Sequence, residues 1–327
     1  MSVLDISHLR VEFGTENGRI FAVKDVSFTL GRGEILALVG ESGCGKSTVA
    51  MSIPRLLGDS NVTIGGSVRL NGADLSTLNE KEMQAVRGKD ISVVFQEPMT
   101  SLNPAYTIGN QIAEVIRQHQ KLSRQAARAR AVELLQLVGI PDAARRLGAF
   151  PHELSGGMRQ RVMIAIAVAC DPQVLIADEP TTALDVTIQA GILDIFRRLR
   201  DTLGTSIILI THDLGVVADI ADRVAIMYAG RIVELCGAQD VFSLPSHPYT
   251  VGLLGALPAR AIMQAGRRRL TDIPGFVPPP TSDPDECEFA PRCPRATAEC
   301  VLRRPVLEPV APGHEVSCYH PGPGDTP

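Results

Sequence analysis

An apolar run leads directly into a glycine-rich loop early in the chain. The run is Ile35-Leu-Ala-Leu-Val39, and the residues that follow are Gly40-Glu-Ser-Gly-Cys-Gly-Lys46-Ser47-Thr48. The spacing GxxxxGKS predicts a strand, a tight loop and a helix, because glycines let successive backbone N–H groups turn toward phosphate oxygens. The loop therefore predicts a protein that binds a nucleoside triphosphate.

Each polar residue of this loop has an expected role. The Lys46 ammonium would reach the β and γ phosphates, and the Ser47 hydroxyl would bind Mg²⁺, a hard cation that prefers oxygen ligands. The expected nucleotide-binding residues of the loop are Gly40, Ser42, Gly43, Cys44, Gly45, Lys46, Ser47 and Thr48.

The composition is that of an ordinary globular protein. The 327 residues, 45% hydrophobic and 21% charged, allow one large α/β domain with an appendage or two modest domains. The formal net charge of -4 gives no electrostatic reason to expect a nucleic-acid partner. The first residues alternate like a strand rather than a secretory signal, and no apolar stretch reaches the roughly 20 residues that cross a bilayer. We expect a cytosolic protein that acts at a membrane only through partners.

Hydrophobic periodicity predicts how the chain is organised. Residues 3–13 and 21–30 read as strands of an antiparallel sheet that leads into a parallel core. Short strands are expected at 66–70, 91–95, 174–177, 206–210 and 223–227, and helices at 46–57, 108–119, 123–138, 186–203 and 214–222. The helices at 108–119 and 123–138 form a helical insert, and proline, arginine and cysteine beyond residue 258 predict a separate, irregular appendage.

Two carboxylates end the strand Val174-Leu-Ile-Ala-Asp178-Glu179, at the strand end where open α/β sheets bind ligands. We expect Asp178 to hold Mg²⁺ and Glu179 to orient or deprotonate the attacking water. His212, at the end of the next strand, could donate a hydrogen bond to the γ phosphate. The structural alternatives are a solvated carboxylate pair and a histidine that serves only the fold.

A second glycine-containing segment, Leu154-Ser155-Gly156-Gly157-Met158-Arg-Gln-Arg161, opens a helix. It repeats the anion-binding chemistry of a helix N-terminus without a lysine. Such a segment suits the γ phosphate of a nucleotide that is held elsewhere.

These elements together resemble the ATP-binding cassette (ABC) ATPase subunits. The resemblance covers residues 1–240 and rests on the phosphate loop, Gln96, the Ser155 segment, the acidic strand, Ala183-Leu184-Asp185 and His212. Met158 departs from the glutamine of many members, although the peptide-importer branch resembles this chain there. The resemblance implies two cassettes paired head to tail, each closing over the other's ATP through Ser155, Gly156, Gly157 and Asp185.

The resemblance also implies roles outside the loops. Phe13 would stack on the adenine, with a core phenylalanine or Phe21 as the alternatives, and Gln96 would sense Mg²⁺ and the γ phosphate. The helical insert would dock on membrane subunits. The implied fold is a P-loop (RecA-like) α/β core with an antiparallel β subdomain (1–95 and 162–258), a helical subdomain (96–161) and a small C-terminal metal-binding extension (259–327).

Four cysteines cluster in the last 41 residues, at Cys287, Cys293, Cys300 and Cys318. Thiolates at these spacings can hold zinc or a four-iron cluster, although the spacings are wider than the CxxC pairs usual for zinc. Free thiols are the third reading, and His314 and His320 leave a mixed zinc site open. The other cysteines, Cys44, Cys170 and Cys236, read as ordinary thiols, although Cys44 could make the phosphate loop sensitive to thiol reagents.

The tail also carries a resemblance of its own. Ser246-His-Pro-Tyr-Thr250 and Phe289-Ala-Pro-Arg-Cys293-Pro are similar to the C-terminal extension of oligopeptide and dipeptide importer ATPases. That resemblance implies a [4Fe-4S] cluster on the four cysteines. It also implies an ATP-hydrolysing subunit on the cytoplasmic face of the inner membrane, working with a second cassette, two permease subunits and, indirectly, an extracytoplasmic binding protein.

Three other functions are weighed against a peptide importer. The same cassette could power nickel or oligosaccharide import, because the ATPase does not touch the cargo. A soluble, non-transport cassette should carry coiled-coil inserts, a second cassette or a basic surface, and the sequence has none of these. A module that binds ATP without hydrolysing it should lack a catalytic residue, whereas Glu179 and His212 are both in place.

Overall fold

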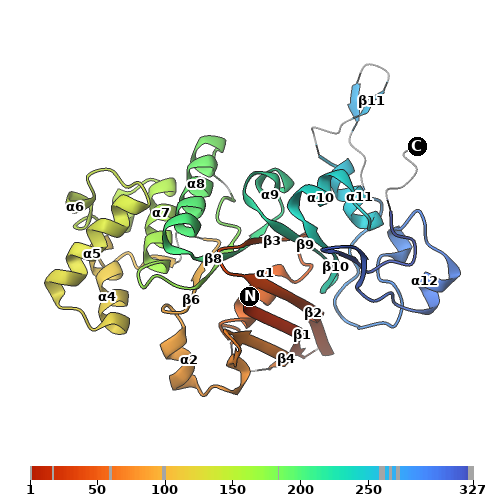
Figure 1. Cartoon of the computed structure of the whole chain (residues 1–327), viewed down its shortest axis with the longest axis horizontal. Helices are drawn as coiled ribbons and strands as arrows, with labels where there is room; N and C mark the ends of the chain where they lie inside the picture. Colours follow the sequence, from red (N-terminus) through yellow and green to blue (C-terminus); the bar gives the residue numbers. More distant parts are fainter. Residues whose placement is uncertain are drawn as a thin grey trace. The chain divides into compact units, whose positions relative to one another are not determined.

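The computed structural model describes residues 2–16, 18–58, 61–97, 101–182, 184–257, 262–264, 267–269 and 273–322. The chain divides into two compact units that interleave in sequence (Figure 1). The phosphate-loop unit comprises Ile6–Phe28, Leu36–Ser67 and Thr211–Pro327, and the helical unit comprises Met1–Asp5, Thr29–Ile35 and Val68–Ile210. Each unit is described separately.

A sheet in the order β4-β1-β2-β10-β9-β3 forms the framework of the phosphate-loop unit. Its strands are β1 (Ser2–Thr15), β2 (Gly18–Gly31), β3 (Ile35–Val39), β4 (Val62–Leu70), β9 (Arg223–Tyr228) and β10 (Arg231–Gly237). All five residues of β3 are buried, and β3 pairs in parallel with β9 from Leu36↔Arg223 to Val39↔Ile226. A hairpin turn joins β9 to β10, with positive φ at Ala229 and Gly230.

Short helices cover this framework: α1 (Lys46–Ser52), α9 (Leu214–Ile220), α10 (Ala238–Ser243) and α11 (Pro248–Gly255). The helix α1 ends five residues before the predicted end at Leu57, because Pro54 removes a backbone donor. The core of the unit gathers Val39, Val217, Ile226, Tyr249 and Phe289. Phe289 belongs to the C-terminal extension, so the extension contributes to this core.

The C-terminal extension contains β11 (Ile262–Gln264), β12 (Arg267–Arg269), η4 (Ala290–Arg292), α12 (Ala298–Leu302), β13 (Glu308–Ala311) and β14 (His314–Val316). β14 pairs antiparallel with β10, through Glu234↔Val316 and Leu235↔Glu315. The expectation of a separate appendage is therefore wrong, because the extension adds a strand to the sheet of the phosphate-loop unit. The predicted domain boundaries stay a prediction.

The helical unit contains a parallel sheet in the order β8-β7-β6, from β6 (Ile91–Val94), β7 (Val174–Asp178) and β8 (Ser206–Thr211). Its helices are α2 (Glu80–Val86), α4 (Ile108–Gln120), α5 (Arg124–Leu137), α6 (Ala143–Arg146), α7 (Gly156–Ala167) and α8 (Val186–Leu203), with β5 (Ala73–Asp74), η1 (Leu75–Thr77) and η2 (Pro151–Glu153). The helices α4 to α7 pack together (Figure 1), and α4 and α5 correspond to the two helices predicted for the helical insert.

Candidate functional site

The phosphate loop joins β3 to α1 and depends on glycine at two positions. A Cβ on Gly45, which has a φ of 101°, would lie 2.3 Å from the Ala22 carbonyl oxygen. A Cβ on Gly40 would lie 2.3 Å from the Met227 carbonyl oxygen. Real Cβ atoms do not approach backbone that closely, so only glycine permits this loop to pack between neighbouring strands.

The Lys46 ammonium lies within the curve of the loop. It donates hydrogen bonds to the carbonyl oxygens of Gly40 at 2.8 Å and Glu41 at 3.0 Å, and its side chain is buried. Cys44 Sγ lies 3.7 Å from the same nitrogen, and burial raises the pKa of this thiol. The thiol therefore stays protonated near neutral pH, which argues against reactivity with thiol reagents.

The other expected residues of the phosphate-loop unit lie on its surface. Ser42, Gly43 and Ser47 are exposed, and Thr48 is half-buried in the first turn of α1. Phe13 is half-buried on β1, and His212 is exposed just after β8. Their roles toward a nucleotide stay predictions.

In the helical unit, Glu179 follows β7 in a left-handed conformation with a φ of 45°. Its Oε2 accepts hydrogen bonds from Gln96 Nε2 at 3.0 Å and from Thr182 Oγ1 at 2.9 Å. Asp178, the last residue of β7, is buried. The structure thus brings Gln96 and Glu179 together as a polar pair at the carboxyl end of the strands, where nucleotide chemistry was expected.

The Ser155 segment is the N-terminus of α7, as predicted. Ser155 caps the helix by accepting a hydrogen bond from the Met158 N–H, and both Ser155 and Gly156 are exposed. A Cβ on Gly157 would lie 2.7 Å from Ile188 Cγ2, so this glycine serves the packing of α7 on α8. Asp185 caps α8 by accepting from the Ile188 N–H at 2.9 Å, and Ala183 lies outside the described residues.

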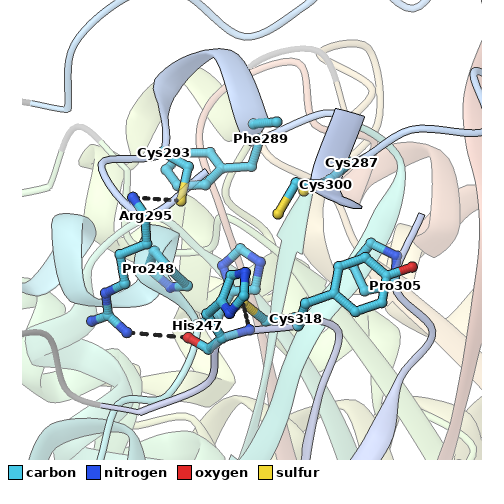
Figure 2. Close-up of a pocket in the computed structure, with 12 residues that line it drawn as sticks. His247, Pro248, Cys287, Phe289, Cys293, Arg295, Cys300, Pro305 and Cys318 are labelled. Carbon is cyan, nitrogen blue, oxygen red and sulfur yellow. Dashed lines mark hydrogen bonds between the residues drawn. The ribbon is translucent and has the colours of Figure 1, made fainter. Parts of the chain in front are cut away.

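The four C-terminal cysteines line one pocket (Figure 2). Phe289 and Pro305 lie among its apolar lining residues, and His320 is at its edge, where its Nε2 lies 3.0 Å from Thr297 Oγ1. Burial raises the pKa of the Cys287 thiol to about 11, and it also raises the pKa of the Cys293 and Cys318 thiols. Binding a metal here would therefore release protons.

The spacing of the sulfurs distinguishes between metals. A tetrahedral zinc site, with Zn–S near 2.3 Å, brings its sulfurs to about 3.8 Å from one another. No three of these four described cysteines place their sulfurs within 4.8 Å of one another. Two backbone N–H groups donate to sulfurs, that of Arg295 to Cys293 and that of His320 to Cys318, and Thr297 Oγ1 lies 3.5 Å from Cys300 Sγ. These sulfurs are therefore more widely spaced than a tetrahedral zinc site requires.

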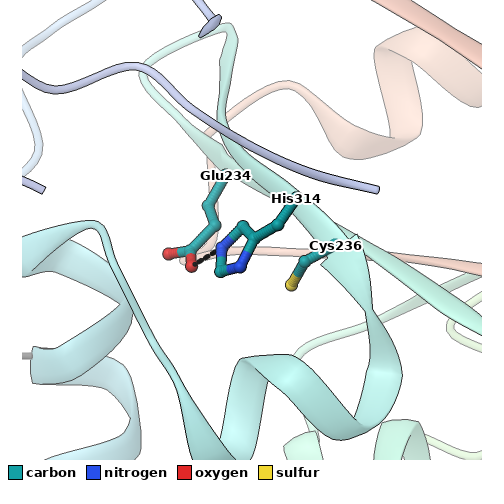
Figure 3. Close-up of side chains that lie close together, drawn as sticks. All are labelled: Glu234, Cys236 and His314. Atoms are coloured by element: carbon teal, nitrogen blue, oxygen red, sulfur yellow. Dashed lines mark hydrogen bonds and ion pairs between the residues drawn. The ribbon is translucent and has the colours of Figure 1, made fainter. Parts of the chain in front are cut away.

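Glu234, Cys236 and His314 form a second buried cluster (Figure 3). Glu234 accepts hydrogen bonds from His314 Nε2 at 2.8 Å and from the N–H groups of Ser246 and His247. Burial raises the pKa of the Cys236 thiol to about 12. With the carboxylate satisfied by donors and the thiol protonated, the cluster anchors β14 and α11 to β10 and does not resemble a metal site.

Comparison with known proteins identifies the family. The model of the ABC transporter family matches residues 23–182, and that of the oligopeptide/dipeptide transporter C-terminal region matches residues 233–300. The chain is 48% identical to the dipeptide transport ATP-binding protein DppD of Bacillus subtilis (strain 168), over 97% of this chain and 94% of that one. This chain belongs to the ATP-binding proteins of ABC transporters.

Two further matches agree with this ABC ATPase assignment. The oligopeptide transport ATP-binding protein OppD of Mycobacterium bovis (strain ATCC BAA-935 / AF2122/97) is 50% identical over 97% of this chain and 51% of its own length. The dimeric, post-hydrolysis structure of the cassette MJ0796 bound to ADP and Pi superposes with a TM-score of 0.65 and 26% identity, covering 72% of this chain and 98% of that one. The ABC ATPase therefore uses ATP, and the predicted cassette fold is confirmed.

Several residues of this ABC ATPase were not anticipated from its sequence. Arg292 of η4 binds the Glu41 carboxylate in the phosphate loop, and the Tyr249 hydroxyl accepts a hydrogen bond from the Glu41 N–H. The one sequence signal was the position of Arg292 between two of the clustered cysteines.

Among the described residues, no helix combines the length and apolar character that crossing a membrane requires.

Proposed function

We propose that this ABC ATPase energises the import of dipeptides and oligopeptides. The observation that carries the proposal is the similarity of both cassette and C-terminal extension to proteins named for dipeptide and oligopeptide transport. The cassette alone is shared by transporters of many cargoes. The extension is the part of the chain that points to this branch.

The residues at the two strand ends and in the phosphate loop support ATP hydrolysis in the proposed roles. Lys46 and the loop N–H groups would bind the phosphates, while Ser47, Gln96 and Asp178 would hold Mg²⁺, which neutralises developing phosphate charge when bound. Glu179 would take the proton of the attacking water, with Gln96 holding its carboxylate at 3.0 Å. His212 would donate to the γ phosphate and Phe13 would stack on the adenine.

The proposed assembly contains a second cassette, identical or different. Ser155 and Gly156 are exposed at the N-terminus of the 12-residue helix α7, where unpaired N–H groups favour an anion. Together with Gly157 and Asp185, they would meet the γ phosphate of ATP on the partner cassette. Nucleotide-dependent closure of this dimer would be the power stroke.

Two permease subunits are the proposed membrane partners, with an extracytoplasmic binding protein acting through them. A wide groove over α4, α5 and α7 supports this role, since it is lined by polar side chains around the half-exposed Tyr106, including Asn103, Gln111, Glu114, Arg117 and Arg128. A cytoplasmic segment of a permease could seat in such a groove. The ABC ATPase would then sit at the cytoplasmic face of the inner membrane.

We assign the pocket of Cys287, Cys293, Cys300 and Cys318 to a [4Fe-4S] cluster, with zinc as the alternative. A cluster held there would cross-link segments of the extension. The proposed role is structural, because transport does not require electron transfer. Protein purified anaerobically and then denatured should release iron and acid-labile sulfide in equal amounts, close to four of each per chain. Release of zinc alone would overturn the assignment.

The experiment that tests the transport function uses the whole assembly in lipid. The ABC ATPase, its membrane subunits, partner cassette and binding protein are reconstituted, and ATP hydrolysis is measured with and without short peptides. Stimulation by peptides is the expected result. Hydrolysis that responds to nickel or oligosaccharides instead would show that the cargo is not a peptide. Hydrolysis that does not depend on the membrane subunits would contradict a transport role.

A further inference from the structure

Glu41, the second residue of the phosphate loop, is held from three directions. Its carboxylate accepts two hydrogen bonds from the Arg292 guanidinium, at 2.8 and 3.2 Å. Its N–H donates to the Tyr249 hydroxyl oxygen at 3.0 Å, and its carbonyl oxygen accepts from Lys46 at 3.0 Å. One residue therefore links the extension, α11 and the phosphate-binding lysine.

The Arg292 side chain is also held by contacts other than its salt bridge with Glu41. Its side chain is only 5% exposed, its Nε donates to the Pro274 carbonyl oxygen at 2.9 Å, and its guanidinium lies 5.7 Å from the centre of the Tyr228 ring. The hydrogen bond to Glu41 raises the pKa of Arg292, and burial raises the pKa of Tyr249. Arg292 therefore stays charged and Tyr249 stays neutral across ordinary pH, so neither of these two partners of Glu41 changes its charge.

Arg292 belongs to the cysteine loop, defined here as residues 287–293. Arg292 directly precedes Cys293, and backbone hydrogen bonds join Ala290 to Cys287 and Cys293 to Ala290. Phe289 in the same loop packs against the rings of Tyr228 and Tyr249. The position of the Arg292 guanidinium is therefore set by the conformation of the cysteine loop.

We propose that Arg292 and Tyr249 are positioning residues for ATP, which act through Glu41 to hold the phosphate loop in its binding conformation. The C-terminal extension thereby sets the ATP affinity of the cassette. The physical reason is that Glu41 adjoins Gly40 and binds Lys46, so its displacement moves groups that must converge on the phosphates. The inference rests on the proposed role of the phosphate loop in binding ATP.

The test compares Arg292→Met with Arg304→Met in the full chain. Arg304 offers a matched control because it is also a paired arginine of the extension, but its partners, Asp283 and Asp285, lie within the extension. MgATP affinity is measured with a fluorescent ATP analogue, together with KM and kcat for hydrolysis. We expect about tenfold weaker binding and a raised KM for Arg292→Met, near the lower end of typical couplings between sites, with kcat changed less than about twofold.

Arg304→Met should bind ATP within about twofold of the wild type, and Arg292→Lys should fall between the wild type and Arg292→Met, since lysine keeps the charge but loses the bidentate contact. A double-mutant cycle with Glu41→Gln should show that the two losses do not add. Wild-type affinity in Arg292→Met, or an equal loss in Arg304→Met, would overturn the inference. A lowered melting temperature with unchanged affinity would also overturn it, since it would show a purely structural contact.

These outcomes are separable from failure of the proposed function. If the wild type itself did not bind ATP through its phosphate loop, Lys46→Ala would leave binding unchanged and the proposed role of the loop would fail. If Lys46→Ala abolished binding while Arg292→Met had no effect, only the present inference would fail.

Discussion

At the scale of single residues, Glu179, which accepts a hydrogen bond from Gln96, is the proposed base for ATP hydrolysis and can be tested directly. The Glu179 carboxylate accepts hydrogen bonds from Gln96 and Thr182 through the same oxygen, and these bonds orient it. Glu179→Gln removes the base without changing its size, so kcat should fall at least about 100-fold while MgATP binding is retained. Phosphate release and fluorescent ATP binding measure the two effects.

Thr182→Val is the matched control for that substitution. It removes one hydrogen bond to the Glu179 carboxylate but leaves the base in place, so kcat should fall less than about tenfold. Turnover in Glu179→Gln comparable to that of the wild type would remove the carboxylate from the mechanism.

The positions of the phosphate loop and of the carboxylates at the strand end could be predicted because their sequence signals are local. Lys46 and Ser47 directly follow the glycines that shape their loop, and Asp178 and Glu179 end an apolar run. The contact between Arg292 and Glu41 could not be predicted, because 251 positions separate the partners. A salt bridge of that kind arises from tertiary packing, which leaves no periodic pattern in the sequence.

At the scale of elements, long amphipathic helices were predicted well and several short ones were missed. The helices α4, α5 and α8 agree with their predicted ranges to within one or two residues, because each is long enough to show its apolar spacing. The seven-residue helix α2 was missed. It buries only Met83 and depends on a capping box of Asn79 and Glu82, which is too short a signal to stand out.

The helix caps at Ser155 and Ser123 allow stability and function to be separated. Each hydroxyl accepts the N–H of the third residue of its helix, at 3.4 Å in α7 and 3.2 Å in α5. Ser155→Ala and Ser123→Ala should each lower the free energy of unfolding by about 1 kcal/mol. Only Ser155→Ala should also lower ATP turnover of the assembled transporter, by about tenfold or more. Equal turnover in the two variants would contradict a role for Ser155 at the partner's nucleotide.

The N-cap of α11 predicts a pH dependence. His247 Nδ1 accepts the Tyr249 N–H at 3.0 Å, and burial lowers the pKa of His247 to about 3. The unfolded chain takes up a proton near pH 6.5 while the folded one does not, so this stabilisation is complete above pH 6.5 and declines as the pH falls toward 3. The loss between pH 7 and pH 5 should be about 2 kcal/mol.

His247→Asn is the variant that checks this dependence. Asparagine can cap α11 but does not titrate, so the difference in the free energy of urea unfolding between pH 7 and pH 5 should shrink by about 2 kcal/mol. The wild type and the variant are prepared and measured alike. An unchanged difference would assign the acid sensitivity to other groups.

At the scale of the whole molecule, the extension is held by ion pairs and a hydrogen bond that a sequence cannot reveal. The ion pairs join Lys24 to Glu288, Arg231 to Asp283 and Arg292 to Glu41, and the hydrogen bond joins His314 to Glu234, across separations of 52 to 264 residues. The proline, arginine and cysteine content changes after residue 258, but composition could not show that the C-terminal extension adds a strand to the sheet. The cysteine spacing predicted the shared pocket because those residues are close in the chain.

The buried pair of Lys24 and Glu288 gives the sharpest test of this fastening. The two side chains are 1% and 7% exposed, and burial raises the pKa of Glu288 despite its partner. Lys24→Met removes the hydrogen-bonded cation of this buried carboxylate and leaves only Arg231 Nε, 4.0 Å away, so the free energy of unfolding in urea should fall by about 3 kcal/mol. Lys24→Met with Glu288→Leu should recover most of that loss, because the double change also removes the buried carboxylate. Arg197→Met, which breaks the exposed pair with Asp194 on α8, should cost less than about 1 kcal/mol. If Lys24→Met were as mild as Arg197→Met, the extension would not be held through this pair.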